Sequence, residues 1–111
     1  MATTLHPELH IDVCGDSSDA VLRIGGQLEV RTAGELRRML EVLIEAQPSS
    51  IVLELDAVTS IDAAGLIAVT APVMKARRAS IEVRIVAPDS PRARSFVDRV
   101  GVLPILNRDE R

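Results

Sequence analysis

The chain has 111 residues, of which 47% are hydrophobic, and its formal net charge is −3. This length fits one domain with its own hydrophobic core. With Phe96 as its only aromatic residue and an acidic balance, the chain is unsuited to binding nucleic acid, and no apolar run reaches the ~20 residues that span a bilayer. The single Cys14 excludes an internal disulfide and a cysteine metal site. Together with the lack of a signal peptide, this favours the cytoplasm.

The N-terminal part is expected to start loosely and then form a hairpin. We expect residues 1–8 to be flexible. Leu9, Ile11 and Val13 alternate with polar residues, which is typical of a half-exposed strand. Residues 15–19 are turn formers and residues 20–24 resume an extended pattern, so an antiparallel hairpin is predicted.

A first amphipathic helix is predicted from Thr32 to about Gln47. Thr32 and Glu35 have the T-x-x-E spacing of a capping box, in which each side chain bonds the backbone N–H of the other residue. Pro48 favours an end at Gln47, because proline biases its predecessor away from helical angles. The apolar face at helical spacing consists of Leu36, Met39, Leu40, Leu43 and Ile44.

The middle of the chain is predicted to run from a strand directly into a second helix. Residues 51–55 form a short apolar run, which indicates a strand buried on both faces. Asp62 stands at the N-cap position, where its carboxylate accepts backbone N–H groups. Residues 63–65, Ala-Ala-Gly, then leave the helix start nearly bare, and Pro72 is expected to bend the helix. Another molecule can approach the backbone closely at such a bare turn, so we expect function there.

The C-terminal part completes an alternating pattern. Residues 82–86 are predicted to form a strand, and Ser90-Pro91 begins a helix that ends near Gly101. Residues 102–106 are a short apolar tail that either covers the core as an edge strand or supports a dimer, with the core favoured, and residues 107–111 are expected to be loose. The element order β-β-α-β-α-β-α predicts an α/β domain with a mixed, mostly parallel sheet of four or five strands covered by helices.

The sequence offers little support for catalysis or metal binding. It contains no H-E-x-x-H, G-x-S-x-G, phosphate-loop or dinucleotide-binding motif. Asp56 and Asp62 are six residues apart, and a loop acid with an N-cap explains them better than paired catalytic carboxylates. His6 and His10 are separated by Pro7, which argues against a helix that would align them on one metal. We therefore expect no enzyme activity, no cofactor and no metal.

The segment Leu55–Leu66 resembles the signature of the STAS domain, specifically that of bacterial anti-sigma factor antagonists. That signature is an apolar strand with an aspartate, followed by Asp, two Ser or Thr residues, Gly and Leu at the start of the next helix. Asp56, Asp62, Gly65 and Leu66 match it. Two further stretches are similar to family motifs: Gly26-Gln27-Leu28-Glu29 with Thr32, Ala33 and Leu36, and the tail Val97–Val102. The resemblance covers residues 9–106, which we take as the domain.

The resemblance implies a protein that binds an anti-sigma factor, usually a kinase with a histidine-kinase-like ATPase fold, and so frees a sigma factor. In the family, that kinase phosphorylates a Ser or Thr at the helix start, and the added negative charge breaks the complex. Here Ala63 and Ala64 occupy the hydroxyl positions, and Glu29 replaces the family aspartate. We therefore expect a partner-binding member without phosphorylation control. Thr59 and Ser60, the nearest hydroxyls, are expected to lie in a loop.

The surface that the resemblance implies for partner binding comprises Glu29, Arg31, Thr32, Thr59, Ser60, Asp62, Ala63, Ala64 and Gly65. Two other functions stay open. One is a STAS adaptor subunit of another assembly, such as a lipid-transporting ABC system. The other is a sensor that binds a nucleotide or small anion at the bare helix N-terminus, although the Asp62 carboxylate would repel an anion there. A monomer or a weak dimer is expected.

Overall fold

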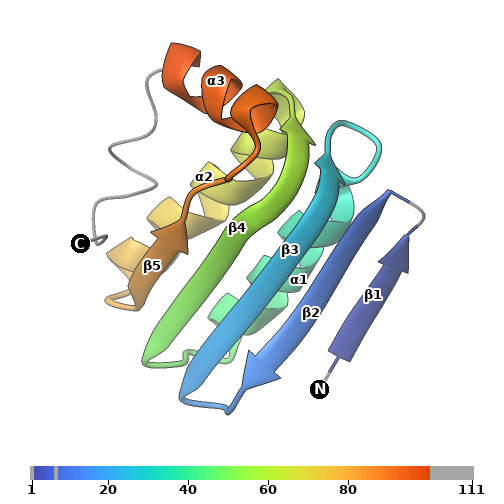
Figure 1. The fold of residues 1–111 in the computed structure, drawn as a ribbon. Helices are drawn as coiled ribbons and strands as arrows, with labels where there is room; N and C mark the ends of the chain where they lie inside the picture. The colour runs from blue at the N-terminus through green and yellow to red at the C-terminus, as the bar shows by residue number, and fades with distance from the viewer. Residues whose placement is uncertain (1, 7, 101–111) are drawn as a thin grey trace.

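The computed structural model describes residues 2–6 and 8–100, which form five strands and three helices (Figure 1). In chain order these are β1 (Ala2–His6), β2 (Leu9–Gly15), β3 (Asp19–Leu28), α1 (Ala33–Glu45), β4 (Ser50–Ile61), α2 (Ala63–Arg78), β5 (Glu82–Val86) and α3 (Pro91–Val100). The strands form one sheet in the order β1-β2-β3-β4-β5. The pairs β1–β2 and β2–β3 are antiparallel, whereas β3–β4 and β4–β5 are parallel. The predicted α/β class and mixed sheet are confirmed, but only two of the four strand pairs are parallel, so the sheet is not mostly parallel as predicted.

The main difference from the predicted order is at the N-terminus, which was expected to be loose. Ala2–His6 instead forms β1 and pairs with β2 along its outer side. Without β1, the backbone N–H and C=O groups on that side of β2 would have no strand partner, and an added strand satisfies them. The sequence of these residues shows no clear alternation of apolar and polar side chains, so it did not predict a strand.

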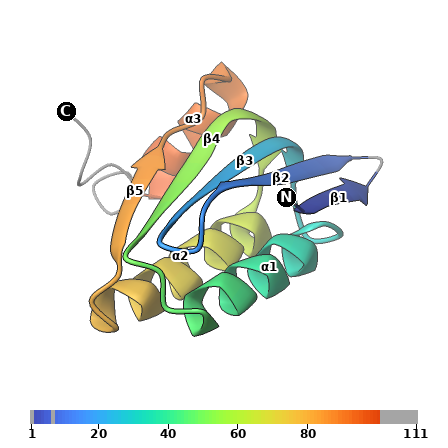
Figure 2. The same cartoon turned by 90° about the horizontal axis from the view of Figure 1, so that it is seen from below.

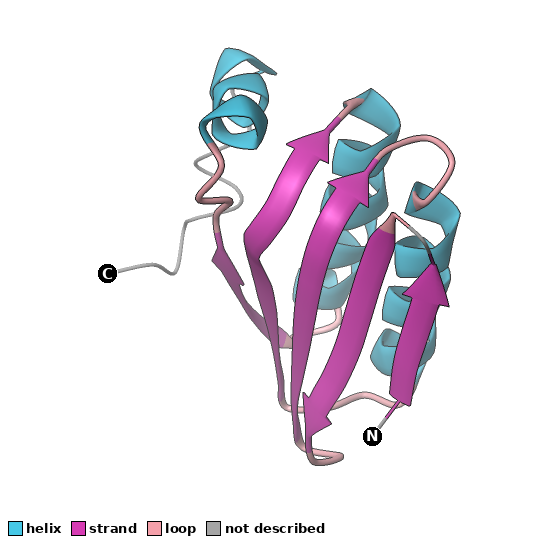
Figure 3. Cartoon of the chain, turned by 45° about the vertical axis from the view of Figure 1, so that its right-hand side comes forward, coloured by secondary structure: helices cyan, strands magenta, loops and turns pink. Residues whose placement is uncertain are grey.

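The two long helices cover the same face of the sheet (Figure 2). α1 and α2 lie side by side against it, whereas α3 lies apart from them near the end of β4 (Figure 3). The prediction that the strand at residues 51–55 is buried on both faces is therefore wrong. Ile51, Leu53 and Leu55 are buried beneath the helices, but Val52 and Glu54 point to the uncovered face and are partly exposed.

Strand β4 is much longer than the apolar run that predicted it. It continues to Ile61, so Thr59 and Ser60 lie in a strand and not in the loop that was expected. Residues beyond Leu55 stay extended because β3 runs alongside to Leu28 and supplies ladder partners, with register shifts on either side of Gly25 and Gly26. Polar residues do not interrupt a strand whose backbone groups remain paired.

The apolar face predicted for α1 is confirmed. Leu36, Leu40 and Ile44 of α1 are buried, with Met39 and Leu43 partly buried against the same core. α2 contains Pro72 in its interior, and α3 begins at Pro91. The predicted helix stop at Gly101, the edge strand at residues 102–106 and the loose tail at residues 107–111 fall outside the described residues.

Candidate functional site

The predicted site residues come from two segments that the sheet places next to each other. β3 and β4 are parallel neighbours, and Leu28 is the register partner of Ile61. The carboxyl ends of β3 and β4 lie at the same end of the sheet. Residues 29–32 after β3 and residues 59–65 at the β4–α2 junction therefore meet there (Figure 1). We call these two segments together the paired turn.

Asp62 fixes the geometry of the paired turn. It is the N-cap of α2, and its Oδ1 accepts a hydrogen bond from Gly65 N at 2.9 Å, as predicted. Its Oδ2 accepts a second hydrogen bond, from Val30 N at 3.1 Å. One carboxylate therefore caps the helix and also holds the neighbouring segment. The sequence predicted the first role but gave no sign of the second, because the register of β3 against β4 is not readable from spacing.

Thr32 acts within its own segment, and the predicted capping box with Glu35 is not formed. Thr32 is fully buried, and its Oγ1 accepts a hydrogen bond from Glu29 N at 3.0 Å and donates to Gln27 O at 2.7 Å. Its backbone has helical angles, φ −112° and ψ −17°, whereas a capping residue is normally extended. The hydroxyl therefore turns back toward the end of β3, and Glu35 lies 4.0 Å from Arg38.

The two hydroxyl residues at the end of β4 have different surroundings. Ser60 is 9% exposed, and its Oγ donates to Glu29 Oε2 at 2.7 Å, which ties the carboxylate of one segment to the other. The Thr59 side chain is exposed, and its carbonyl accepts a hydrogen bond from Ser90 Oγ at 3.1 Å. Arg31 points away from this cluster and forms an ion pair with Glu8 at 2.6 Å.

Gly65 allows the backbones of β3 and α2 to touch. A Cβ atom at this position would lie 2.0 Å from the carbonyl oxygen of Leu28, a separation that real Cβ atoms do not adopt. The missing side chain thus serves internal packing. Gly65 itself is buried against this neighbouring strand.

Apolar side chains are exposed on and beside the paired turn, together with those of Arg31 and Thr59. Val30 is 71% exposed and Ile67, in the first turns of α2, is 60% exposed. Ala63 is exposed and Ala64 is partly exposed. We call Val30, Ala63, Ala64 and Ile67 the apolar tip. Val30 and Ile67 were not among the predicted site residues.

Within the described residues, no group of three or more His, Cys, Asp or Glu side chains could hold a metal ion. Asp56 lies in β4 and not in the loop that was expected, and it lines a hollow on the uncovered face of the sheet with His10 and Arg23. Both oxygens of Asp62 accept backbone N–H groups, as the predicted N-cap role requires for one of them. Among the helices that the structure describes, none is long and apolar enough to cross a membrane.

Fold and site define a small α/β domain whose candidate site is a hydrogen-bonded turn with exposed apolar side chains. The family model of the STAS domain matches residues 10–109, so the chain belongs to the STAS domain family. A search of curated proteins gave no match.

Solved structures give the same fold. An anti-sigma factor antagonist from Mycobacterium paratuberculosis superposes with a TM-score of 0.77 at 19% identity, covering 92% of this chain and 86% of that one. The anti-sigma factor antagonist SpoIIAA in its unphosphorylated form gives 0.71 at 17% identity, covering 85% and 83%. A sulfate transporter family protein from Wolinella succinogenes gives 0.65 at 21% identity, covering 86% and 77%. At these identities the likeness establishes the fold.

Proposed function

We propose that this protein binds an anti-sigma factor through the paired turn and thereby regulates sigma-factor-dependent transcription. The observation that carries the proposal is the double hydrogen bonding of Asp62, which presets the turn and presents the apolar tip to solvent. A preset surface binds more tightly because less conformational freedom is lost on association. The family and the two antagonist structures with this fold support the same function.

We further propose that binding here is independent of phosphorylation. Ala63 and Ala64 carry no hydroxyl at the helix start. Ser60 is buried and hydrogen-bonded to Glu29, so a kinase would have to open the turn to reach it. The proposed partner has the ATPase fold of the family's kinases, the proposed compartment is the cytoplasm, and the protein itself is proposed to be no enzyme.

A second candidate is a STAS adaptor in a transport assembly. One specific observation favours it, namely the shared fold with a sulfate transporter family protein. A lipid-transporting ABC system is one such assembly, and the same paired turn would serve as the contact. The sensor alternative lacks comparable support, because the Asp62 carboxylate already accepts the Gly65 N–H at this helix start and would repel an anion.

Binding to purified anti-sigma factors from the same genome, measured by calorimetry, tests the proposal. Ala64→Glu places a charge in the apolar tip, and we expect affinity to fall at least tenfold, or about 1.4 kcal/mol. Ser17→Glu adds the same charge in the exposed turn between β2 and β3, at the other end of the sheet, and should leave affinity unchanged. Equal effects of both variants, or recovery of a transporter subunit and no anti-sigma factor in a pull-down, would contradict it.

The absence of phosphorylation control has its own test. The protein is incubated with the anti-sigma factor that it binds and with ATP, and residues 59–66 are examined by mass spectrometry. We expect no phosphate there. Phosphate on Thr59, whose side chain is exposed, would overturn this part of the proposal and leave partner binding itself intact.

A further inference from the structure

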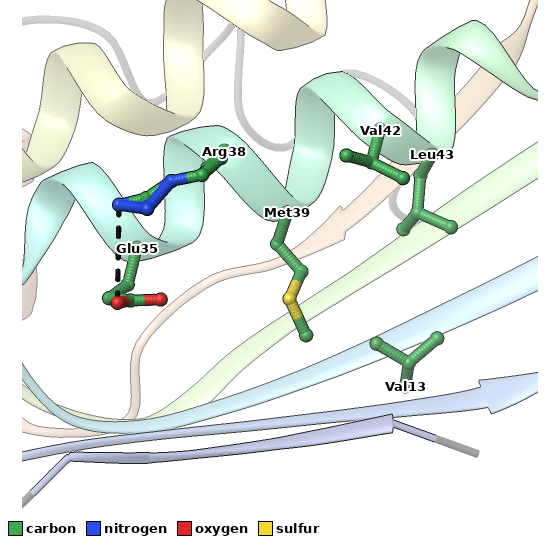
Figure 4. Close-up of a pocket in the computed structure, with 6 residues that line it drawn as sticks. All are labelled: Val13, Glu35, Arg38, Met39, Val42 and Leu43. Atoms are coloured by element: carbon green, nitrogen blue, oxygen red, sulfur yellow. Dashed lines mark ion pairs between the residues drawn. The ribbon is translucent and has the colours of Figure 1, made fainter.

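A second surface lies on α1, on the side that faces β2 and the sheet edge (Figure 4). There α1 and β2 bound an open groove of about 290 Å³ that is lined by Val13, Glu35, Arg38, Met39, Val42 and Leu43. Met39 extends from the helix toward Val13 on the strand, and Glu35 and Arg38 mark one end of the groove. We call it the α1 groove. It shares no residue with the paired turn.

Val42 is unusual among the apolar residues of α1. It is 64% exposed, although Leu36, Leu40 and Ile44 on the same helix are buried. It lies at the outer rim of the α1 groove, with the partly buried Met39 and Leu43 beside it. A large exposed aliphatic side chain next to an apolar groove is a feature of an interaction surface.

The charges beside Val42 show what kind of partner fits. Arg38 precedes Val42 by four residues and Glu45 follows it by three, so all three lie on one stripe of the helix, and all three are exposed. At 1.5 Å per residue, Arg38 lies about 6 Å from Val42 along the axis and Glu45 about 4.5 Å on the other side. The stripe thus reads positive, apolar, negative.

When two copies of this stripe pack antiparallel, the positive end of each faces the negative end of the other. A two-fold axis through Val42 sets two α1 helices antiparallel, so that the two Val42 side chains meet at the axis. Arg38 of one copy then faces Glu45 of the second copy, and the reverse pair forms by symmetry, as a two-fold interface requires.

The existing ion pairs leave both charges available for this exchange. Arg38 lies 4.0 Å from Glu35, and the Arg38 side chain is 67% exposed, so that pair is weak. Glu45 takes part in no ion pair within the described part of the chain. On the adjoining face, Arg37 and Glu41 form an ion pair at 3.3 Å within one chain, so each charge already has a partner of opposite sign.

From these observations we propose that the α1 groove is a homodimer interface, in which α1 packs antiparallel against α1 of a second copy. One helix pair buries little surface, so the dimer is weak and forms at high concentration. This proposal is independent of the proposed function, because the two surfaces share no residue.

Sedimentation of the full chain up to about 1 mM, a range suited to a small interface, tests the proposal. We expect a concentration-dependent monomer–dimer equilibrium. Val42→Glu brings two like charges together on the axis and should raise the dimer dissociation constant at least tenfold. A chain that stays monomeric throughout, or a Val42→Glu variant with unchanged dimerisation, would overturn the interface.

A charge exchange tests the pairing itself. Arg38→Glu alone and Glu45→Arg alone each place like charges across the interface, and each should weaken the dimer several-fold. The double variant R38E/E45R restores opposite charges and should recover most of the affinity. Arg38 and Glu45 are two turns apart, about 10 Å, so rescue within one chain is not expected. Arg37→Glu, on the adjoining face, is the control and should leave dimerisation unchanged.

The dimer and the proposed function fail in different ways. If dimerisation is absent but the anti-sigma factor binds, the α1 groove assignment is wrong and the paired turn stands. If Val42→Glu separates the dimer while Ala64→Glu leaves it intact, the two surfaces are distinct, as proposed. Weakening of the double variant R38E/E45R beyond either single variant would contradict the antiparallel pairing.

Discussion

Asp62 is the residue that converts two separate segments into one surface. Each of its carboxylate oxygens accepts one backbone N–H group, from Gly65 and from Val30. Hydrogen bonds to a charged acceptor are stronger than neutral ones, and here they cross from one chain segment to the other. The residue type is predictable from the N-cap rule, whereas the second partner depends on which strands are neighbours.

Two glycines in helices, Gly65 and Gly34, differ in the space available for a side chain. Gly65→Ala places a Cβ against the Leu28 carbonyl, so a backbone must move, and we expect a loss of about 1–3 kcal/mol in the free energy of unfolding. Gly34→Ala, near the start of α1, meets nothing within 4 Å and should stabilise the protein by about 0.4–1 kcal/mol. Urea denaturation measures both. Similar effects of the two substitutions would contradict the close contact of Gly65 with Leu28.

Asp16 gives the turn between β2 and β3 a dependence on pH. Hydrogen bonds from the backbone N–H groups of Asp19 and Ser18 hold the pKa of the Asp16 carboxyl below its ordinary value. The ionised form thus favours the folded state, and its contribution is present above the unfolded-state pKa and is lost as pH falls through the folded-state pKa. We expect the carboxyl carbon to titrate below the ordinary pKa of an aspartate by NMR, and the stability difference between the protein and Asp16→Ala to shrink in acid. A midpoint above that value would contradict the assignment.

At the scale of elements, the start of α1 can be stabilised either by a capping box of Thr32 and Glu35 or by the Thr32 hydroxyl alone. A capping box would make Thr32 and Glu35 contribute together, whereas in the structure only the Thr32 hydroxyl bonds the backbone. Thr32→Val leaves Glu29 N and Gln27 O without that partner in a buried place, and should cost about 1–3 kcal/mol. Glu35→Ala should change the free energy of unfolding by less than about 0.5 kcal/mol. A larger cost for Glu35→Ala, measured by urea denaturation, would restore the capping box.

Elements with a strong periodic pattern were predictable, and elements defined by their neighbours were not. The apolar face of α1 and the short strand β5 follow from spacing alone. The second half of β4 carries polar residues and stays extended only because β3 runs beside it. For the same reason, the contact between Ser60 and Glu29 could not be foreseen, since it joins residues that only the sheet brings together.

At the scale of the whole molecule, the paired turn and the α1 groove are two separate surfaces. The paired turn lies at the edge where β3 and β4 end, and the α1 groove lies on the long side of α1 that faces β2. A partner on the first region and a second copy on the second would contact different residues. The domain is therefore able to present its paired turn in either oligomeric state.

The contribution of β1 to the whole molecule can be measured by removing it. The apolar cluster of the described side chains, from Leu9 to Val97, lies within the part of the chain that this truncation keeps. We expect it to unfold cooperatively, with a loss of about 1 kcal/mol or about 4–8 °C in melting temperature, because the net gain of a few terminal hydrogen bonds is largely offset by ordering the chain. Leu22→Ala, in the central core, should cost about 2–5 kcal/mol. The shortened chain should also aggregate more readily, since β2 then becomes an unprotected edge strand. If removal of residues 1–6 abolishes the folding transition, β1 is part of the core and not an addition to its edge.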